Sequence, residues 1–208
     1  MFTSTETLRF SNSTIVRNLE PRETNQYPWA LVRSIELDDG SALRLRPIHP
    51  DDEPGLVEFF HRLSPRTMYQ RFFRAYDRLP DHWYRHFANV DYLTRLALVA
   101  EERVTGGAQL RALAQYEPGD APAMTEIAIV VEDAWQRRGL GGLMVDALLA
   151  AAEARGRRRF TADVFADNRP MLRVLRRLGN IQRHELEAGV LTLEFERRSV
   201  ASALGFNS

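Results

Sequence analysis

The sequence predicts a mixed α/β fold, in which a single mixed sheet is flanked by helices. Segments with strand periodicity alternate along the chain with segments of helical periodicity. Two turn motifs, Asp38–Ser41 and Thr105–Gly107, each lie between apolar runs and indicate hairpins. An apolar strand, Met124–Val131, leads through a glycine-rich turn directly into an amphipathic helix. Together these features favour one α/β domain rather than a helical bundle or a β-sandwich.

The N-terminal half is predicted to carry one hairpin and three helices. Residues 1–30 are polar and aperiodic, and we expect a mobile N-terminal extension. The domain proper is predicted to span residues 31–198, followed by a tail at residues 199–208. The hairpin is expected near residues 35–46. Asp51 and Asp52 should cap the first helix, and the others begin at Ser64–Pro65 and Pro80–Asp81.

The C-terminal half alternates strands and helices. The predicted elements are strands at 96–100, 108–116, 124–131 and 160–165, helices from 139 and at 168–178, and a hairpin at 181–195. Because glycine is favoured just after a helix, we expect Gly156 and Gly179 to terminate the two helices.

The composition excludes several classes of function. The formal net charge is zero, so no overall attraction to nucleic acid or to anionic membranes is expected. The chain has no cysteine, which excludes disulfides, a thiol nucleophile and cysteine-based metal sites. It shows neither a secretory leader nor a run of about 20 apolar residues. We therefore expect a cytoplasmic protein that binds neither nucleic acid nor membrane.

The turn after the central strand reads Gln136-Arg137-Arg138-Gly139-Leu140-Gly141-Gly142. Glycines allow close approach of a ligand, and a helix N-terminus offers unpaired N–H groups, a combination that binds phosphate. A P-loop needs a lysine, and this chain has none. The glycine spacing also differs from that of dinucleotide-binding folds. The turn thus indicates a diphosphate site, with a packing turn as the alternative.

This pattern resembles the GNAT superfamily of acyl-CoA-dependent N-acyltransferases, whose motif is Arg/Gln-x-x-Gly-x-Gly/Ala after a central strand. Gln136, Gly139 and Gly141 occupy its fixed positions, and Asn168 begins a segment similar to the second CoA-proximal helix. Three segments of the N-terminal half resemble the GNAT domains of bacterial protein lysine acetyltransferases: 45–52, 63–73 and 89–92. The resemblance implies a GNAT fold with a splayed central strand, acetyl-CoA as co-substrate and a protein lysine as acceptor.

The resemblance also implies where acetyl-CoA binds. The main chain of the central strand would hold the thioester and the pantetheine arm, the turn would hold the pyrophosphate, and Asn168 would contact the arm. The implied residues are Ile129, Val130, Val131, Gln136, Arg137, Arg138, Gly139, Leu140, Gly141, Gly142 and Asn168. Either arginine of the turn could add a bidentate contact.

Glu126 is the predicted general base. A lysine amine is almost wholly protonated at pH 7, so a base must remove its proton. A carboxylate in an apolar strand should be partly desolvated, which raises its pKa, and the resemblance places the base at this position. The alternatives are a solvent-facing carboxylate or one paired with arginine. Glu101 and Glu102 are rival candidates that we interpret as a strand-end charge pair facing water.

Other features leave the reaction partly open. Leu175 stands where many family members have a tyrosine that protonates the leaving thiolate. His82 and His86 have metal-pair spacing, but no third ligand is evident and no metal is expected. Arginines 66, 71 and 74 would suit an acidic substrate better than a polyamine. A small amine as acceptor, a non-catalytic acyl-CoA sensor and a homodimer all remain open.

Overall fold

The computed structural model describes residues 26–121 and 123–198. The strands are β1 (Arg33–Glu36), β2 (Ala42–Pro47), β3 (Leu96–Val104), β4 (Gly107–Pro118), β5 (Met124–Val131), β6 (Arg159–Phe165), β7 (Gly179–Glu187) and β8 (Val190–Arg197). The helices are α1 (Glu53–His61), α2 (Pro65–Phe72), α3 (Asp81–Ala88), α4 (Leu140–Glu153) and α5 (Arg169–Leu178). Short 3₁₀ turns lie at Trp29–Leu31, Pro50–Asp52 and Asp133–Trp135. The predicted mixed α/β fold is confirmed.

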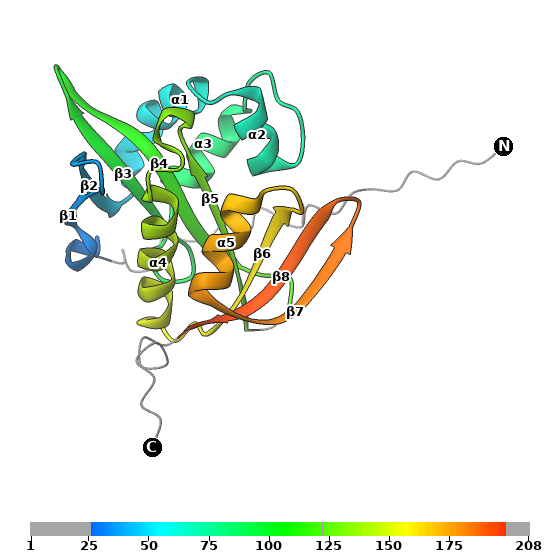
Figure 1. Cartoon of the computed structure of the whole chain (residues 1–208). Coiled ribbons are helices and arrows are strands. Elements are labelled where there is room, and N and C mark those ends of the chain that lie inside the picture. The colour runs from blue at the N-terminus through cyan, green and yellow to red at the C-terminus, as the bar shows by residue number, and fades with distance from the viewer. Residues whose placement is uncertain (1–25, 122, 199–208) are drawn as a thin grey trace.

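All strands belong to one sheet with the order β1-β2-β3-β4-β5-β6-β8-β7 (Figure 1). Neighbouring strands are antiparallel except β5 and β6, which are parallel. A parallel pair requires a crossover, and α4 provides it between the two strands. The glycine-rich turn therefore lies at the carboxyl end of β5, beside the gap toward β6.

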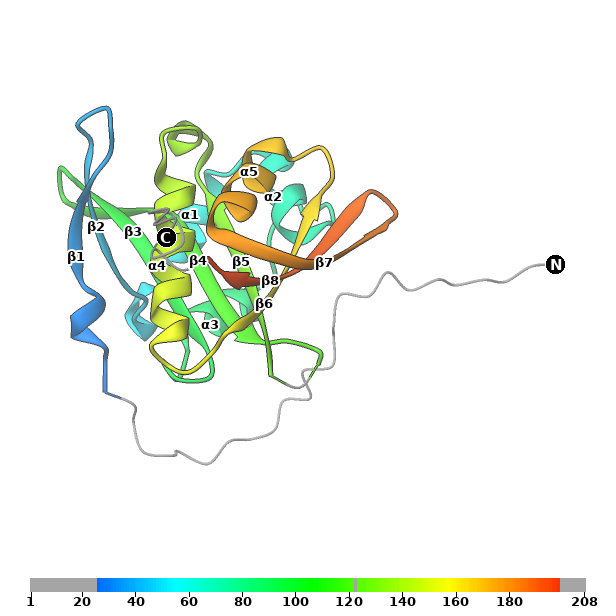
Figure 2. The same ribbon diagram turned by 60° about the horizontal axis from the view of Figure 1, so that its bottom comes forward.

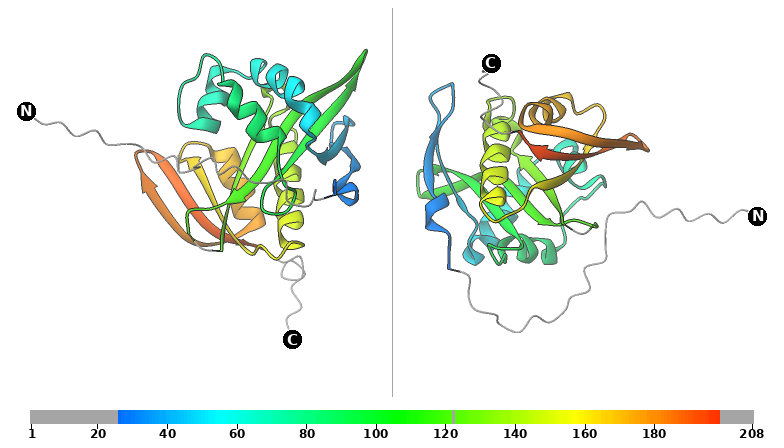
Figure 3. Two further views of the ribbon diagram at one scale, coloured as in Figure 1. Left: turned by 180° about the vertical axis from the view of Figure 1, so that it is seen from behind. Right: turned by 90° about the horizontal axis from the view of Figure 1, so that it is seen from below.

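Helices cover both faces of the sheet. In Figures 1 and 3, α1, α2 and α3 lie on one face, and α4 and α5 lie on the other. The first core joins α1–α3 to the sheet, with Leu56, Phe59 and Leu113 buried. The second core packs α4 against the opposite face, with Met144 and Tyr116 buried. These two layers fix α2 and α4 on opposite sides of β5.

The sheet opens between β5 and β6. The β4–β5 ladder runs from Thr125 to Val131, whereas β5 pairs with β6 only over Met124–Glu126 (Figure 2). Beyond Glu126 the two strands diverge, and the β6-facing edge of β5 has no strand partner. This is the splayed central strand that the resemblance implied.

The register shows which main-chain groups face this gap. The Glu132 N–H donates to the Arg111 carbonyl at 2.9 Å, so it points toward β4. Main-chain groups alternate in direction along an antiparallel ladder, so those of Ile129 and Val131 point toward β6. The main-chain N–H and C=O groups of Val130 point toward β4, so Val130 faces the gap between β5 and β6 only through its side chain.

The structure bears on two predicted caps. As predicted, α5 ends at Leu178 with Gly179 as its C-cap, although the φ of Gly179 is −116° and the residue begins β7. A glycine is needed there for space, since a Cβ would lie 2.6 Å from Cδ2 of Phe195 and 2.9 Å from the Leu175 carbonyl oxygen. At α1, the Asp52 carboxylate accepts from the His49 N–H and from Arg46 rather than capping the helix itself.

Most of the predicted N-terminal extension, and all of the predicted tail, lie outside the described residues. Within the described part, the Tyr27 hydroxyl donates to the Pro47 carbonyl at 2.8 Å, which attaches residues just before the predicted domain boundary to β2. Of the helices described, none combines the length and the apolar character needed to span a bilayer.

Candidate functional site

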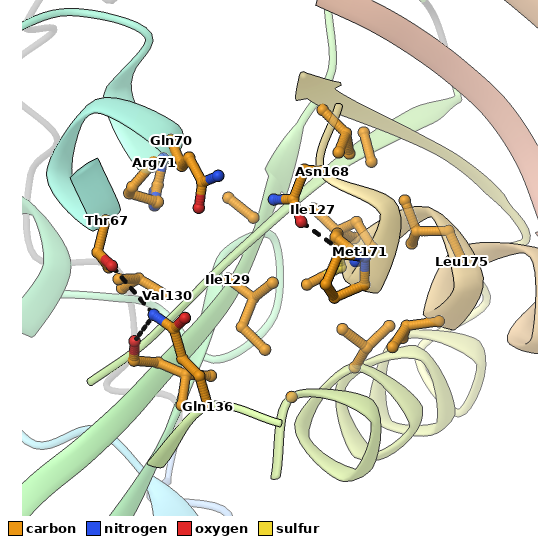
Figure 4. A pocket seen from close by; sticks show the side chains of 18 of the residues that line it. Thr67, Gln70, Arg71, Ile127, Ile129, Val130, Gln136, Asn168, Met171 and Leu175 are labelled. Atoms are coloured by element: carbon orange, nitrogen blue, oxygen red, sulfur yellow. Dashed lines mark hydrogen bonds between the residues drawn. The ribbon is translucent and has the colours of Figure 1, made fainter. Parts of the chain in front are cut away.

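A cavity of about 530 Å³ occupies the gap between β5 and β6 (Figure 4). Its walls come from α2 on one side and from α4 and α5 on the other, with β5 between them. In Figure 4, Gln70 and Arg71 lie on the α2 side, and Asn168, Met171 and Leu175 lie across the cavity. Most of the predicted site residues line it: Glu126, Ile129, Val130, Val131, Gln136, Arg137, Gly139, Gly141, Gly142 and Asn168.

One end of the cavity is formed by main-chain N–H groups. From residue 137 to residue 142 no hydrogen-bond acceptor for these groups is found among the described residues. Arg137 and Gly139 have φ angles of 60° and 88°, and such left-handed residues turn successive N–H groups toward one side of a loop. The first turn of α4 adds the positive end of its dipole. This end, which we call the cradle, is suited to a doubly charged phosphate group.

The glycines of the cradle leave it open. Gly141 lines the cavity, and a Cβ there would make only one close contact, 3.8 Å from Val131 Cγ2. At Gly142 a Cβ would lie 2.6 Å from Nη2 of Arg177. Arg177 of α5 thus lies beside the cradle.

Two predicted cofactor residues lie outside the cavity lining. The Arg138 guanidinium lies over the Trp135 ring at 4.2 Å, donates to Asp39 through Nε at 2.5 Å, and also bonds the Ser41 hydroxyl. Its side chain thus ties the β1–β2 hairpin to the turn, and the predicted bidentate contact is left to Arg137. The Leu140 side chain is fully buried in the α4 core, so only its main-chain N–H can serve the cradle.

Side chains beneath the turn fix its position. Gln136 Nε2 donates to the Val131 carbonyl and to the Thr67 hydroxyl, both at 3.0 Å (Figure 4). Asp133 accepts from the Ser64 N–H at 2.9 Å and from the Thr67 hydroxyl at 2.8 Å. Burial alone would raise the pKa of Asp133, but these hydrogen bonds lower it below its ordinary value. The cradle is therefore joined to the first turn of α2.

Asn168 acts as a helix cap and also faces the cavity. Its Oδ1 accepts from the Met171 N–H at 3.3 Å, which is the capping role expected of an asparagine before a helix. The residue lines the cavity, as Figure 4 shows. Capping uses the side-chain oxygen and leaves the amide NH₂ as a donor toward a ligand.

Glu126 lies at the opposite end of the cavity from the cradle, where β5 and β6 part. The residue is exposed to the cavity and to solvent, although much protein surrounds its carboxylate. Burial raises its pKa above the ordinary value, and Asp163, Glu117 and Asp120 raise it further, while the charge of Arg71 acts against them. No hydrogen bond to its carboxylate is found within the described ranges. The carboxylate is therefore free to accept a proton from a bound molecule.

An aromatic cluster joins the end of α2 to β6 beside the cavity, which Phe73 lines. The Tyr69 ring stacks on Phe165 at 5.1 Å, and the Phe73 ring lies 4.9 Å from the same residue. Sequence reasoning missed this contact, because the three rings come from elements nearly a hundred positions apart and follow no common motif.

The rival acids and the histidines have structural roles. Glu101 is buried and accepts from Arg46 at 2.7 Å, and Glu102 accepts from Arg111 at 2.7 Å. The interpretation as facing water was wrong for Glu101, which is buried, whereas Glu102 is partly exposed; arginines of β2 and β4 neutralise both acids. His86 bonds Glu117 at 2.9 Å, and no cluster of potential metal ligands occurs in the part of the chain described.

Leu175, which stands where the resemblance implied a tyrosine, lines the cavity and is buried. A leucine cannot donate a proton. A leaving thiolate with a pKa near 8.5 is stable enough to depart without one.

Comparisons with known proteins agree with this geometry. The acetyltransferase (GNAT) family matches residues 57–179, which is more than half of the chain. Acetyltransferase Pat of Mycolicibacterium smegmatis is 31% identical over 166 residues, covering 78% of this chain and 48% of that protein. The chain thus spans about half the length of this relative. An acetyltransferase of Pseudomonas aeruginosa is 27% identical over 135 residues, covering 65% of this chain and 73% of that protein.

Solved structures of acyltransferases are also similar to this chain. The GNAT domain of S. lividans PAT is 34% identical with a TM-score of 0.72, covering 82% of this chain and 99% of that domain. A cAMP-binding acyltransferase from Mycobacterium smegmatis is 27% identical with a TM-score of 0.55, and the match covers 88% of this chain and 52% of that protein chain. The splayed strand, the glycine cradle and these matches lead to one conclusion: the chain belongs to the acetyltransferase (GNAT) family.

Proposed function

We propose that this chain is an acetyl-CoA-dependent N-acetyltransferase that acetylates a primary amine, namely a protein lysine, with Glu126 as general base. The observation that carries the proposal is one continuous cavity with unpaired main-chain donors at one end and an unpaired carboxylate at the other. A diphosphate and an amine can therefore be held in the same cavity, on either side of a thioester.

The cofactor end fits coenzyme A through features of the chain itself. The cradle offers N–H groups to a pyrophosphate, and Arg137 can add a charged contact. The β6-facing main chain of Ile129 and Val131 is free to bond the amides of a pantetheine arm, except for the Val131 carbonyl, which Gln136 occupies. Bound acetyl-CoA would supply the acetyl group and a thiolate leaving group.

The chemistry at the acceptor end follows from Glu126. Its carboxylate takes the proton of the incoming amine, and the freed nitrogen lone pair forms the new C–N bond to the acetyl carbon. The N–H of Val131, pointing into the gap, stabilises the negative charge that develops on the carbonyl oxygen, an effect worth a few kcal/mol. The C–S bond then breaks, the nitrogen gives up its second proton to solvent water, and the thiolate leaves without a proton from Leu175.

A protein lysine is favoured as acceptor by two features. The N-terminal segments resemble those of protein lysine acetyltransferases, and the acids Asp163, Glu117 and Asp120 make the surroundings of Glu126 negative, which suits a cationic side chain. Arg66 also lines the cavity, so an acceptor that carries an acidic group near its amine fits the same site.

Calorimetry with coenzyme A tests the cofactor end. We expect measurable heat and a rise in melting temperature, because a ligand that binds only the folded state stabilises it. The absence of both at millimolar coenzyme A would contradict the proposal.

Glu126→Gln tests the base. Turnover should fall at least about tenfold, the lower range for loss of a general base, with acetyl-CoA affinity nearly unchanged. Glu185→Gln, which changes an exposed carboxylate of β7, is the matched control and should retain full turnover. Unchanged turnover in Glu126→Gln rejects this residue as the base.

The acceptor can be identified directly. Acetyl-CoA and the protein are incubated with a lysate of the source cells, and acetylated lysines are mapped. A screen of small amines by thiol release runs beside it. Turnover of small amines without protein acetylation would favour the small-amine alternative. Tight binding without any turnover would favour a sensor.

A further inference from the structure

Arg71 is an arginine that faces the cavity without an ion pair. The short ion pairs of Arg46, Arg111 and Arg197 all involve carboxylates within 2.8 Å, whereas no carboxylate bonds Arg71 in the part of the chain described. Its guanidinium carbon lies 5.0 Å from the centre of the Phe72 ring and 5.8 Å from that of Phe87. These rings hold the cation by its faces and leave its N–H groups unused.

The carboxylates of Glu117 and Glu126 both interact electrostatically with Arg71. Glu117 and Glu126 are direct partners in the β4–β5 ladder, so their side chains lie on the same face of the sheet, the face that α2 covers. Like charges in such a cross-strand pair repel each other. Arg71 interacts electrostatically with both, and these interactions oppose the lowering of its own pKa by burial.

The two carboxylates differ in their hydrogen bonds. Glu117 is held by His86 at 2.9 Å, by Gln115 at 2.9 Å and by Arg95 at 3.5 Å. Its pKa is lowered despite burial, mainly by His86. Glu126 has none of these bonds, and its pKa is raised. Glu117 is thus fixed as a structural anion, and Glu126 is the one able to exchange a proton.

The balance of charge around Glu126 depends on Arg71. Burial disfavours its ionisation most, and Asp163 on β6, Glu117 on β4 and Asp120 in the β4–β5 turn add to this effect. Arg71 on α2 is the cation that acts in the opposite direction. A direct bidentate salt bridge would ionise Glu126 but would also occupy its oxygens and weaken it as a base.

We propose that Arg71 is a positioning residue that keeps Glu126 ionised through space while leaving its oxygens free for the acceptor amine. The inference rests on the proposed function, since it assigns Glu126 the role of base. Phe72 and Phe87 contribute by holding the guanidinium off the carboxylate. Arg71 thus supplies positive charge near Glu126 without forming a hydrogen bond to it.

The test is a titration of the Glu126 carboxyl carbon by NMR in the free protein, assigned with Glu126→Gln. In Arg71→Met the midpoint should rise by about one pH unit, the lower range for loss of a nearby opposite charge. Arg71→Lys keeps the charge and should restore the wild-type midpoint. Glu117→Gln removes a repelling charge and should move the midpoint down. Opposite shifts from two neighbouring variants cannot come from general loosening of the fold.

Two results would overturn the inference. One is an unchanged midpoint in Arg71→Met. The other is an equal rise in Arg71→Met and Arg71→Lys, which would assign the effect to packing. The titration needs no acceptor, so its outcome is separate from that of the proposed function: full turnover by Glu126→Gln removes the base assignment whatever the titration shows. If Arg71→Met does not fold, Arg71→Gln, which removes the charge but keeps a polar side chain, replaces it, and an unchanged midpoint in that variant overturns the inference.

Discussion

The two ends of the cavity differ in whether main-chain or side-chain groups form them. The cradle is main chain, from six consecutive residues whose N–H groups lack acceptors within the described structure. The acceptor end is formed by side chains, namely those of Arg71, Glu126 and Asp163 on three different elements. A site built from main chain tolerates changes of side chain but not of backbone shape or free volume. A site built from side chains responds to single changes of charge.

The largest effect should come from filling the cradle. Gly141→Trp puts a large side chain where a Cβ has open space, and the lost phosphate contacts should weaken coenzyme A binding more than about 100-fold. Calorimetry measures the loss. Ala154→Trp, just after the far end of α4, is the control and should bind normally. Tight binding by Gly141→Trp would show that the diphosphate lies elsewhere.

A smaller effect should distinguish the two ends of the cavity, because turnover should depend on the pKa of Glu126 and coenzyme A affinity should not. Glu126 acts as a base only when deprotonated, and its pKa is raised above the ordinary value of 4.5. The ratio of wild-type to Glu126→Gln turnover should therefore be greatest at neutral pH and fall toward one as the pH drops through this raised pKa. The ratio of their coenzyme A affinities should stay near one at every pH. A turnover ratio independent of pH would mean that Glu126 acts through packing.

The smallest effect should come from the link between the two ends. Gln136→Ala removes hydrogen bonds to Val131 and Thr67, each worth about 0.5–1.5 kcal/mol, and frees the turn to move. We expect coenzyme A affinity to fall about tenfold or less, measured by calorimetry, with the fold intact. Gln182→Ala on the exposed surface of β7 is the control. No change in affinity would mean that the turn keeps its shape without this side chain.

The division between main chain and side chain also explains what the sequence could predict. The cradle is a contiguous motif after a recognisable strand, so Gln136, Gly139 and Gly141 were identified, and the structure places all three at the cavity. The strand and helix order followed from periodicity. The roles assigned to these residues and to Glu126 stay predictions.

What the sequence could not predict depends on distant pairings. Arg138 reads as a phosphate ligand within its motif, but Asp39, nearly a hundred positions earlier, holds its side chain. Gly179 caps α5 as predicted, but the sequence does not show that the Phe195 ring leaves no room for a Cβ there. Arg71 was one of several arginines on a helix until the fold placed it near Glu117 and Glu126. Periodicity and motif spacing carry no information about such contacts.

The short pairing of β5 with β6 has a consequence for the whole molecule. Two portions of one sheet are joined by only three register pairs, from Met124 to Glu126, and the ladder is missing where the cavity lies. Under the proposed function, the amides of a pantetheine arm bound along Ile129 and Val131 would complete that ladder from outside the chain. The bound ligand would then serve as a temporary strand and would raise the resistance of the fold to unfolding.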